Sequence, residues 1–117
     1  MIYIPFQFTT LNDYIDETRR NKFAGAKIKR EETEIARLHF IGKTFQSPLE
    51  VKFKWFVATL GRDLDNLGFC CKYILDGMVK AKAIKGDNLN HVVKITHTFE
   101  KSKKIGVEIE IEQLTNV

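Results

Sequence analysis

The sequence predicts an α+β fold, with one mixed four-stranded sheet, helices packed on one face, and the element order β-α-β-α-β-β. Three observations lead to this prediction. Apolar and polar residues alternate with a period of two in four segments, which is typical of half-buried strands. Apolar residues recur at three- and four-residue steps in two further regions, which is typical of helices. The 117 residues, 44% of them hydrophobic, suffice for one domain, residues 1–117, with a core of its own.

The first half of the chain predicts a strand followed by two helices. Alternating apolar residues predict the strand at its start: Ile2, Ile4, Phe6 and Phe8. Asn12 is expected to cap the next helix, because its side chain can accept a backbone N–H bond. The helical pattern runs from Leu11 to about Lys43 and is interrupted near residues 21–25. We therefore expect a short helix, a basic mobile turn and a longer helix.

The second half predicts a strand, a helix and two more strands. Ser47-Pro48 breaks the chain before a strand at residues 49–58, and the next helix extends over about residues 66–82. Two alternating segments follow: Val93, Ile95, His97 and Phe99, then Ile105, Val107, Ile109 and Ile111. Residues 101–104 are expected to form a hairpin turn between these last strands. The other side of the final strand carries glutamates and is expected to be an outer face.

Two acidic residues stand where the strand pattern ends and the helical pattern begins. Asp63 and Asp65 are two apart, and residues two apart in an extended segment point to the same side. Two carboxylates directed at one point repel each other unless a cation lies between them, and hard cations such as Mg²⁺ prefer oxygen ligands. The alternative is that either residue caps the helix, where a carboxylate accepts backbone N–H bonds and opposes the dipole. Both interpretations are open for a pair at this spacing.

A lysine follows the acid pair on the predicted helix. Lys72 lies seven residues beyond Asp65, which is two helical turns and nearly the same face. Phe69 and Asp76 share that face. The local picture is a pair of metal-binding carboxylates with a lysine a short distance behind them. The alternative for Lys72 is an ordinary surface ion pair with Asp76, four residues away.

A longer run around the acid pair is more specific. It reads Arg62-Asp63-Leu64-Asp65-Asn66-Leu67, then Lys72, then Ile74-Leu75-Asp76-Gly77-Met78, then Ile84 and Gly86-Asp87. This pattern resembles the RusA-type Holliday junction resolvases, in particular the phage-type RusA-like endodeoxyribonucleases. Residues 11–27 also resemble the N-terminal part of phage-type members, so the resemblance covers most of the chain. It implies a metal-dependent endonuclease that works as a homodimer on branched DNA such as four-way junctions. A site made of carboxylate oxygens should accept Mg²⁺, or Mn²⁺ in its place.

The resemblance implies roles for four residues. Asp63 and Asp65 match the first two metal-binding acids of the family. Lys72 matches the active-site lysine in the longer-spaced variant of the motif, and Asp87 matches the third catalytic and metal-binding acid. The chain departs from the pattern at Gly86, where many relatives have another Asp.

Asp87 is separated from the acid pair by a whole predicted helix. A helix over residues 66–82 rises about 25 Å, so Asp87 cannot reach the pair beside one straight helix. Either the helix is short or kinked, or the chain returns along it through residues 82–87, or the third acid comes from the partner subunit. Five extended residues span at most about 18 Å. Of these arrangements we expect the return within one subunit.

Basic residues gather in clusters, although the formal net charge is only +4. Such clusters can neutralise phosphates and release counterions. The alternative is an ordinary solvated surface, because three glutamates within residues 31–34 dilute the first cluster. The residues predicted to contact DNA are Asn12, Arg19, Arg20, Lys22, Lys27, Lys80 and Lys85.

The cysteines and histidines do not predict a second site. Cys70 and Cys71 are adjacent, which would strain a disulfide, and they lack zinc-site spacing. We therefore expect a reduced, cytoplasmic protein, in the host cytoplasm if it is phage-encoded. His97 is expected to be a core or interface residue. Two other function classes stay open: a non-catalytic DNA-binding or structural protein on the same scaffold, and a protein-interaction module with a capped helix.

Overall fold

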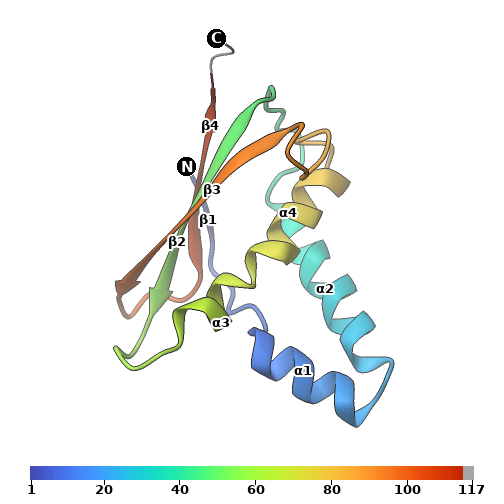
Figure 1. Ribbon diagram of the computed structural model, residues 1–117, viewed down its shortest axis with the longest axis vertical. Coiled ribbons are helices and arrows are strands. Elements are labelled where there is room, and N and C mark those ends of the chain that lie inside the picture. Colours follow the sequence, from blue (N-terminus) through green and yellow to red (C-terminus); the bar gives the residue numbers. More distant parts are fainter. Residues whose placement is uncertain (115–117) are drawn as a thin grey trace.

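A single mixed sheet carries all the helices on one of its sides (Figure 1). The computed structural model describes residues 1–114, and within this range the sheet has four strands in the order β1-β4-β2-β3. Strand β2 pairs in parallel with β3 and antiparallel with β4, which in turn pairs antiparallel with β1. The elements are β1 (Ile2–Ile4), α1 (Leu11–Arg20), α2 (Ala24–Leu38), β2 (Leu49–Val57), α3 (Leu64–Gly68), α4 (Cys71–Lys80), β3 (Val92–Lys101) and β4 (Val107–Gln113). The predicted α+β class, sheet and helix placement are confirmed.

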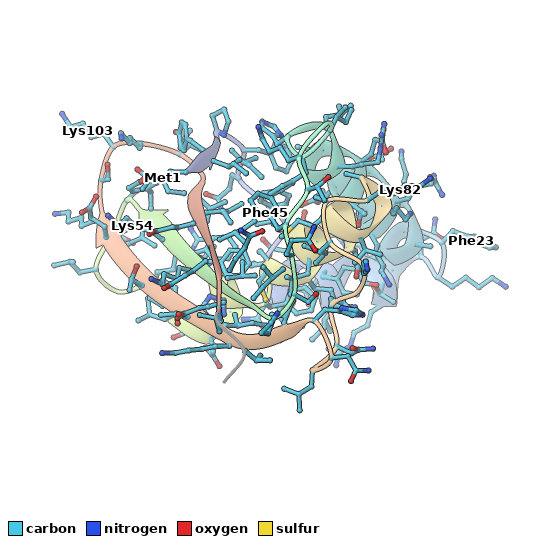
Figure 2. All side chains as sticks on the ribbon, turned by 90° about the horizontal axis from the view of Figure 1, so that it is seen from above. Met1, Phe23, Phe45, Lys54, Lys82 and Lys103 are labelled. Atoms are coloured by element: carbon cyan, nitrogen blue, oxygen red, sulfur yellow. The ribbon has the colours of Figure 1, made fainter. Side chains whose placement is uncertain are left out.

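Strand β2 is an inner strand, paired with both β3 and β4, and its apolar side chains alternate with lysines. Val51, Phe53 and Trp55 are almost fully buried beneath the helices. Lys52 and Lys54 lie on the opposite, open face, where Lys52 Nζ is 3.0 Å from Glu112 Oε2 of β4. Figure 2 shows Lys54 on the sheet side of the molecule and Phe23 on the helix side. The glutamates of β4 therefore meet lysines of β2 on the open face.

The first strand is shorter than the alternating pattern predicted. It ends at Ile4, which pairs with Val107, the first residue of β4. No residue of β4 remains to pair with the chain beyond Ile4, so the predicted extension of the strand through Phe8 is wrong. Phe8 is nevertheless buried, and its ring stacks on that of Tyr73 with the centroids 5.8 Å apart.

The predicted hairpin between the last two strands is also wrong. Strands β3 and β4 are not neighbours, because β2 lies between them. The intervening segment crosses the end of β2, where Ser102 N–H donates to the Val57 carbonyl (2.9 Å) and Phe56 N–H to that of Gly106 (3.1 Å). A period-two pattern identifies the face on which a side chain lies, not the neighbouring strand.

The helices begin and end close to the predicted breaks, with two corrections. The cap of α1 is Thr10, not Asn12, which lies in the first turn. The helix predicted over residues 66–82 is broken into α3 and α4. Tight turns join them, since Cys70 N–H donates to the Leu67 carbonyl (3.0 Å). None of the helices within residues 1–114 combines the length and the apolar character needed to cross a membrane.

Candidate functional site

The acid pair stands between the end of β2 and the start of α3. Asp63 takes the N-cap position of α3 with an extended backbone (φ −70°, ψ 115°), and its side chain makes no capping bond. Asp65 already belongs to the first helical turn. The expectation that both residues lie in one extended segment is therefore wrong. Both side chains are exposed, and within residues 1–114 neither forms an ion pair, so two negative charges stand together without a cation.

Hydrogen bonds on Asn66 and Asp65 fix the start of α3. Asp65 Oδ1 accepts the backbone N–H of Asn66 (2.9 Å), which leaves its other oxygen for an external ligand. Asn66 Oδ1 accepts the backbone N–H of Asn12 (2.8 Å) and so ties α3 to the first turn of α1. The rings of Tyr14 and Phe69 pack together, with 5.9 Å between their centroids. The acid pair therefore lies at the start of a helix that α1 holds through a hydrogen bond and an aromatic contact.

A buried polar network beneath α3 was missed by the sequence reasoning. The carbonyl of Thr9 accepts the hydroxyl of Tyr73 (3.0 Å) and the thiol of Cys70 (3.4 Å). The N–H of Thr9 donates to Glu32 Oε1 (2.6 Å), and its hydroxyl donates to the other carboxylate oxygen. Glu32 is only 7% exposed. The signal was available, because Glu32 lies four residues after Ile28 and so on the inward face of α2.

Lys72 forms the ion pair with Asp76 that was the alternative interpretation of it. Its Nζ is 3.6 Å from Asp76 Oδ2, and Lys29 Nζ of α2 is 3.9 Å from the same oxygen. The side chain of Lys72 is 53% exposed, whereas that of Asp76 is 21% exposed. The Asp76 carboxylate is thus already neutralised by two lysines, in contrast to the acid pair.

Asp87 lies near Asp76 and not near the acid pair. Both residues line a cavity of about 520 Å³ between α2 and α4, together with Ala26, Lys29, Arg30, Thr33, Val79 and Lys80. The second half of α4 lines this cavity, and the first half, which rises about 7 Å from Cys71 to Asp76, lies between the cavity and α3. Within residues 1–114 no group of three acidic, histidine or cysteine side chains is arranged to hold a metal ion. One chain by itself therefore does not bring Asp87 to Asp63 and Asp65.

A second, smaller cavity adjoins the acid pair. It measures about 380 Å³ and is lined by Leu64, Asp65, Gly68, His97 and Phe99. Its walls come from α3 and from the helix-side face of β3. Asp65 therefore lies beside an edge strand of the sheet.

The residues predicted to contact DNA are spread over two regions, and all are exposed. Arg19 and Arg20 form the last turn of α1, and Lys22 follows in the turn before α2. Arg20 pairs with Glu17 (3.4 Å) and Lys27 with Glu31 (4.0 Å), so part of this charge is offset. Lys80 ends α4, and Lys85 lies in the loop before Asp87. Asn12 is placed beside the acid pair by its bond to Asn66.

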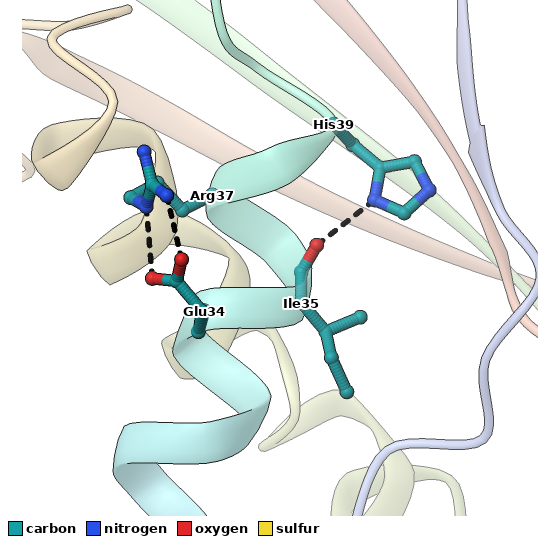
Figure 3. Close-up of polar contacts among 4 residues, drawn as sticks. All are labelled: Glu34, Ile35, Arg37 and His39. Carbon is teal, nitrogen blue, oxygen red and sulfur yellow. Dashed lines mark hydrogen bonds and ion pairs between the residues drawn. The ribbon is translucent and has the colours of Figure 1, made fainter.

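The histidines have structural contacts. His39 ends α2, where its Nδ1 lies 2.9 Å from the Ile35 carbonyl, next to the two-pronged contact between Arg37 and Glu34 (Figure 3). His91 Nδ1 lies 2.9 Å from the Ser47 hydroxyl oxygen. His97 Nδ1 accepts the indole N–H of Trp55 (2.9 Å), and burial lowers the pKa of this imidazole.

The two cysteines are free thiols. Burial raises the pKa of the Cys70 thiol to about 12 and also raises the pKa of Cys71. A thiol with a raised pKa holds its proton at neutral pH and is a poor nucleophile.

Comparison with models of protein families, with curated proteins and with solved structures found no match for this chain. Mg²⁺ is commonly held by one or two carboxylates, and waters and substrate phosphate oxygens complete its octahedron. Asp63 and Asp65 fit that donor set, because both are exposed and without a counter-ion among residues 1–114.

Proposed function

We propose that this protein is a metal-dependent endonuclease that cleaves branched DNA, with four-way Holliday junctions as its substrate. The observation that carries the proposal is the acid pair Asp63 and Asp65, exposed and without an ion-pair partner in the described chain. Such a pair is stabilised by a divalent cation, and DNA phosphates supply the remaining oxygens. The resemblance of the run from Arg62 to Asp87 to RusA-type resolvases supports branched DNA as the substrate.

In this proposal Asp63 and Asp65 hold Mg²⁺, or Mn²⁺ in its place. The bound ion polarises the scissile phosphate and lowers the pKa of water. Asp65 presents one oxygen outward, because the other accepts the N–H of Asn66. Asn66 in turn keeps α3 against α1 through its bond to Asn12. The role of these residues is to hold two carboxylates in a fixed position at the surface.

Lys72 is proposed to stabilise the charge on the phosphate or on the leaving oxygen. It now contacts Asp76, but Lys29 contacts the same carboxylate oxygen at a similar distance. Lys72 can therefore turn toward a phosphate and leave Asp76 paired with Lys29. Its long, half-exposed side chain permits that movement.

The substrate would be held by exposed basic residues of α1 and of the turn that follows it. Arg19, Arg20 and Lys22 stand at the end of α1, the helix that contacts α3. Each lysine or arginine that neutralises a phosphate releases counterions and strengthens binding. A homodimer suits a four-way junction, because two symmetric strands require two related cuts. The cytoplasm is the compartment in which such an enzyme would meet DNA.

A second candidate is a non-catalytic DNA-binding protein on the same scaffold. The position of Asp87 favours it, since this residue lines the cavity beside Asp76, away from the acid pair. If three acids are needed for turnover, one chain supplies only two of them, Asp63 and Asp65, at the start of α3. Such a protein would bind junctions through its basic residues without cutting them.

Cleavage of a labelled synthetic four-way junction, compared with a linear duplex of the same sequence, tests the proposal. We expect cuts in the junction with Mg²⁺ or Mn²⁺, binding without efficient turnover with Ca²⁺, and no cuts in excess EDTA. The Asp65→Asn variant serves as the matched control for a contaminating nuclease. Junction binding without cleavage under all metal conditions would establish the non-catalytic alternative, and undiminished cleavage in EDTA would falsify the metal-dependent mechanism.

A further inference from the structure

The two edges of the sheet differ in length and in what they expose. The β1 edge is only three residues long. The β3 edge is ten residues long and exposes two large apolar side chains, Val93 at 43% and Ile95 at 42%. A long edge with exposed apolar residues is a template for another strand, and proteins usually blunt such edges. The β3 edge is therefore a candidate surface for pairing with another strand.

The backbone groups that β3 presents to its open side follow from its pairing with β2. Ser102 N–H donates to the Val57 carbonyl at the end of the ladder. Val57 is paired with Lys101, Trp55 with Phe99 and Phe53 with His97. In a regular parallel ladder, alternate residues bond to the neighbour and the others face away. The N–H and C=O groups of Ile95, His97 and Phe99 consequently face the open edge.

We propose that a second copy of this chain pairs antiparallel along the β3 edge, with the two-fold axis passing beside His97. In this register each His97 lies opposite its counterpart, and Ile95 lies opposite the partner's Phe99. These are the residues whose backbone groups face outward, so they can exchange the paired hydrogen bonds of an antiparallel ladder. The interface is isologous, as a closed dimer requires.

Charge selects this register among the alternatives. It places Lys94 directly opposite the partner's Glu100, and it does so twice, once on each side of the axis. A shift of the register by two residues places Lys94 opposite a threonine or a serine instead. Lys94 and Glu100 are both exposed on the open face of the sheet. Lys94 Nζ lies 3.6 Å from Glu50 Oε2 of its own chain, and its side chain is still 65% exposed, so it can also face a second carboxylate. Opposite charges directly across a strand pair are favourable, and like charges are unfavourable.

The helix-side face of the same edge contributes apolar contact. Ile95 and Phe99 lie on this face, and Leu64 of α3, which is 46% exposed, stands beside Phe99 at the small cavity. Cross-strand pairs of an aromatic and a β-branched residue stabilise sheets. The second copy would cover these apolar residues. They are exposed in a single chain because that copy is absent.

The dimer also changes the acid site, an extension that rests on the proposed function. A two-fold axis perpendicular to the paired edges puts the helices of both copies on one face of a continuous sheet. The partner's β3 then begins opposite Ser102, just past Lys101, at the end of the sheet where β2 leads toward Asp63. The partner's Asp87 precedes that strand by five residues, next to a turn in which the N–H groups of His91 and Val92 donate to the Asn88 carbonyl (2.9 Å each). This turn keeps Asp87 close to the start of the strand, at the same end of the sheet as the other chain's Asp63. The partner's Asp87 can thus be the third acid beside Asp63 and Asp65.

Sedimentation equilibrium of the intact protein over a concentration series tests the interface. The wild type should dimerise, and Lys94→Glu or Glu100→Lys alone should each raise the dissociation constant roughly tenfold or more, because each creates two like-charge pairs. Lys94→Glu also faces Glu50 of its own chain, so circular dichroism of each variant checks that the fold is kept. A mixture of the two variants should restore dimerisation, because the heterodimer pairs opposite charges at both positions. Lys103→Glu, an exposed charge outside the paired strand, is the matched control and should leave the equilibrium unchanged. A monomeric wild type, or a mixture no tighter than either variant alone, would overturn the proposal.

The same charge pair makes the shared site testable through forced heterodimers. One chain carries Lys94→Glu with Asp65→Asn, and the other carries Glu100→Lys with Asp87→Asn. If the third acid comes from the partner, one of the two sites keeps Asp63, Asp65 and Asp87, and one junction strand is nicked. If each chain uses its own Asp87, both sites are inactive and the shared site is overturned. The heterodimer with all acids intact is the reference; if it dimerises without cutting, the proposed nuclease function fails while the interface stands.

Discussion

The acids at the start of α3, Asp63 and Asp65, and the acids at the α2–α4 cavity, Asp76 and Asp87, have different surroundings. Asp76 is half-buried and lies within ion-pair distance of Lys29 and Lys72, and Asp87 lines the cavity next to it. Asp63 and Asp65 are exposed, and the described chain gives them no cation. A carboxylate with lysines around it has its charge satisfied by the fold, whereas a pair without them leaves room for an external cation. The presence or absence of nearby lysines, more than the residue type, therefore separates structural acids from candidate metal ligands.

Replacing Asp65 should have the largest effect and tests the exposed pair directly. Asp65→Asn is expected to lower junction cleavage by about 1,000-fold or more, because a metal ligand is lost. Thermal stability should change little, since the side chain is exposed. Cleavage rates with saturating Mg²⁺ and melting temperatures are the measurements. Asp76→Asn is the matched control, and a similar loss of cleavage in that variant would erase the distinction between the two pairs.

Replacing Lys72 should have the next largest effect. Lys72→Ala is expected to lower cleavage by about 100-fold, because stabilisation of transition-state charge is lost. Junction affinity should fall only slightly, and the salt dependence of binding should decrease by about one charge at most. Lys29→Ala removes the other lysine from Asp76 and is the control. Cleavage at the wild-type rate in Lys72→Ala would leave Lys72 as a surface partner of Asp76 alone.

Gly77 of α4 packs closely against α2, and its replacement should lower the stability of the protein. A Cβ on Gly77 would lie 2.7 Å from Ala36 Cβ and 2.9 Å from the Thr33 carbonyl oxygen. Gly77→Ala should therefore lower the free energy of unfolding by about 1–3 kcal/mol through overpacking. Urea denaturation followed by circular dichroism measures the change. Gly61→Ala is the control, because nothing lies within 4 Å of that added methyl group; equal losses in both variants would contradict close packing at Gly77.

The smallest expected effect is a pH dependence of stability from His97, which packs against α3. Burial lowers the pKa of its imidazole below the ordinary value of 6.5. The unfolded chain therefore binds a proton at a higher pH than the folded chain does. Stability should decrease as the pH falls below about 6.5 and level off once the folded imidazole also titrates. Urea midpoints between pH 7.5 and 5 measure this decrease, and an unchanged slope in His97→Gln would exclude His97 as its source.

The sequence predicted where the strands and helices lie along the chain better than it predicted which strands pair in the sheet. Strand β2 begins and ends within one residue of the predicted range 49–58, and the break before α2 falls within residues 21–25 as expected. Alternation reports which face a side chain occupies, so it could not show that β2 separates β3 from β4. The helix break near Cys70 was hidden because the apolar spacing from Leu67 to Met78 continues through the tight turns.

For the candidate site, the sequence could predict which residues are candidates, but it could not predict which of them lie close together in the fold. The sequence identified the acid pair and Lys72, since their spacing along the chain is local. The position of Asp87 depends on how the chain leaves α4, where Lys82 adopts a left-handed conformation (φ 62°). A lysine carries no sequence signal for that conformation, which is uncommon outside glycine. The buried bond of Glu32 to Thr9 was likewise set by tertiary packing.

The crossing of residues 102–106 over the end of β2 has a consequence for folding. Strand β2 cannot pair with either of its neighbours until late in synthesis, because β3 and β4 follow it in the sequence by many residues. The helices contain mostly local contacts and can form early, whereas every strand pair in the sheet joins residues far apart in sequence. Such long-range pairing slows the search for the native state. We therefore expect a nascent chain that ends before residue 107 to expose one side of β2 and to fold only when β4 has left the ribosome.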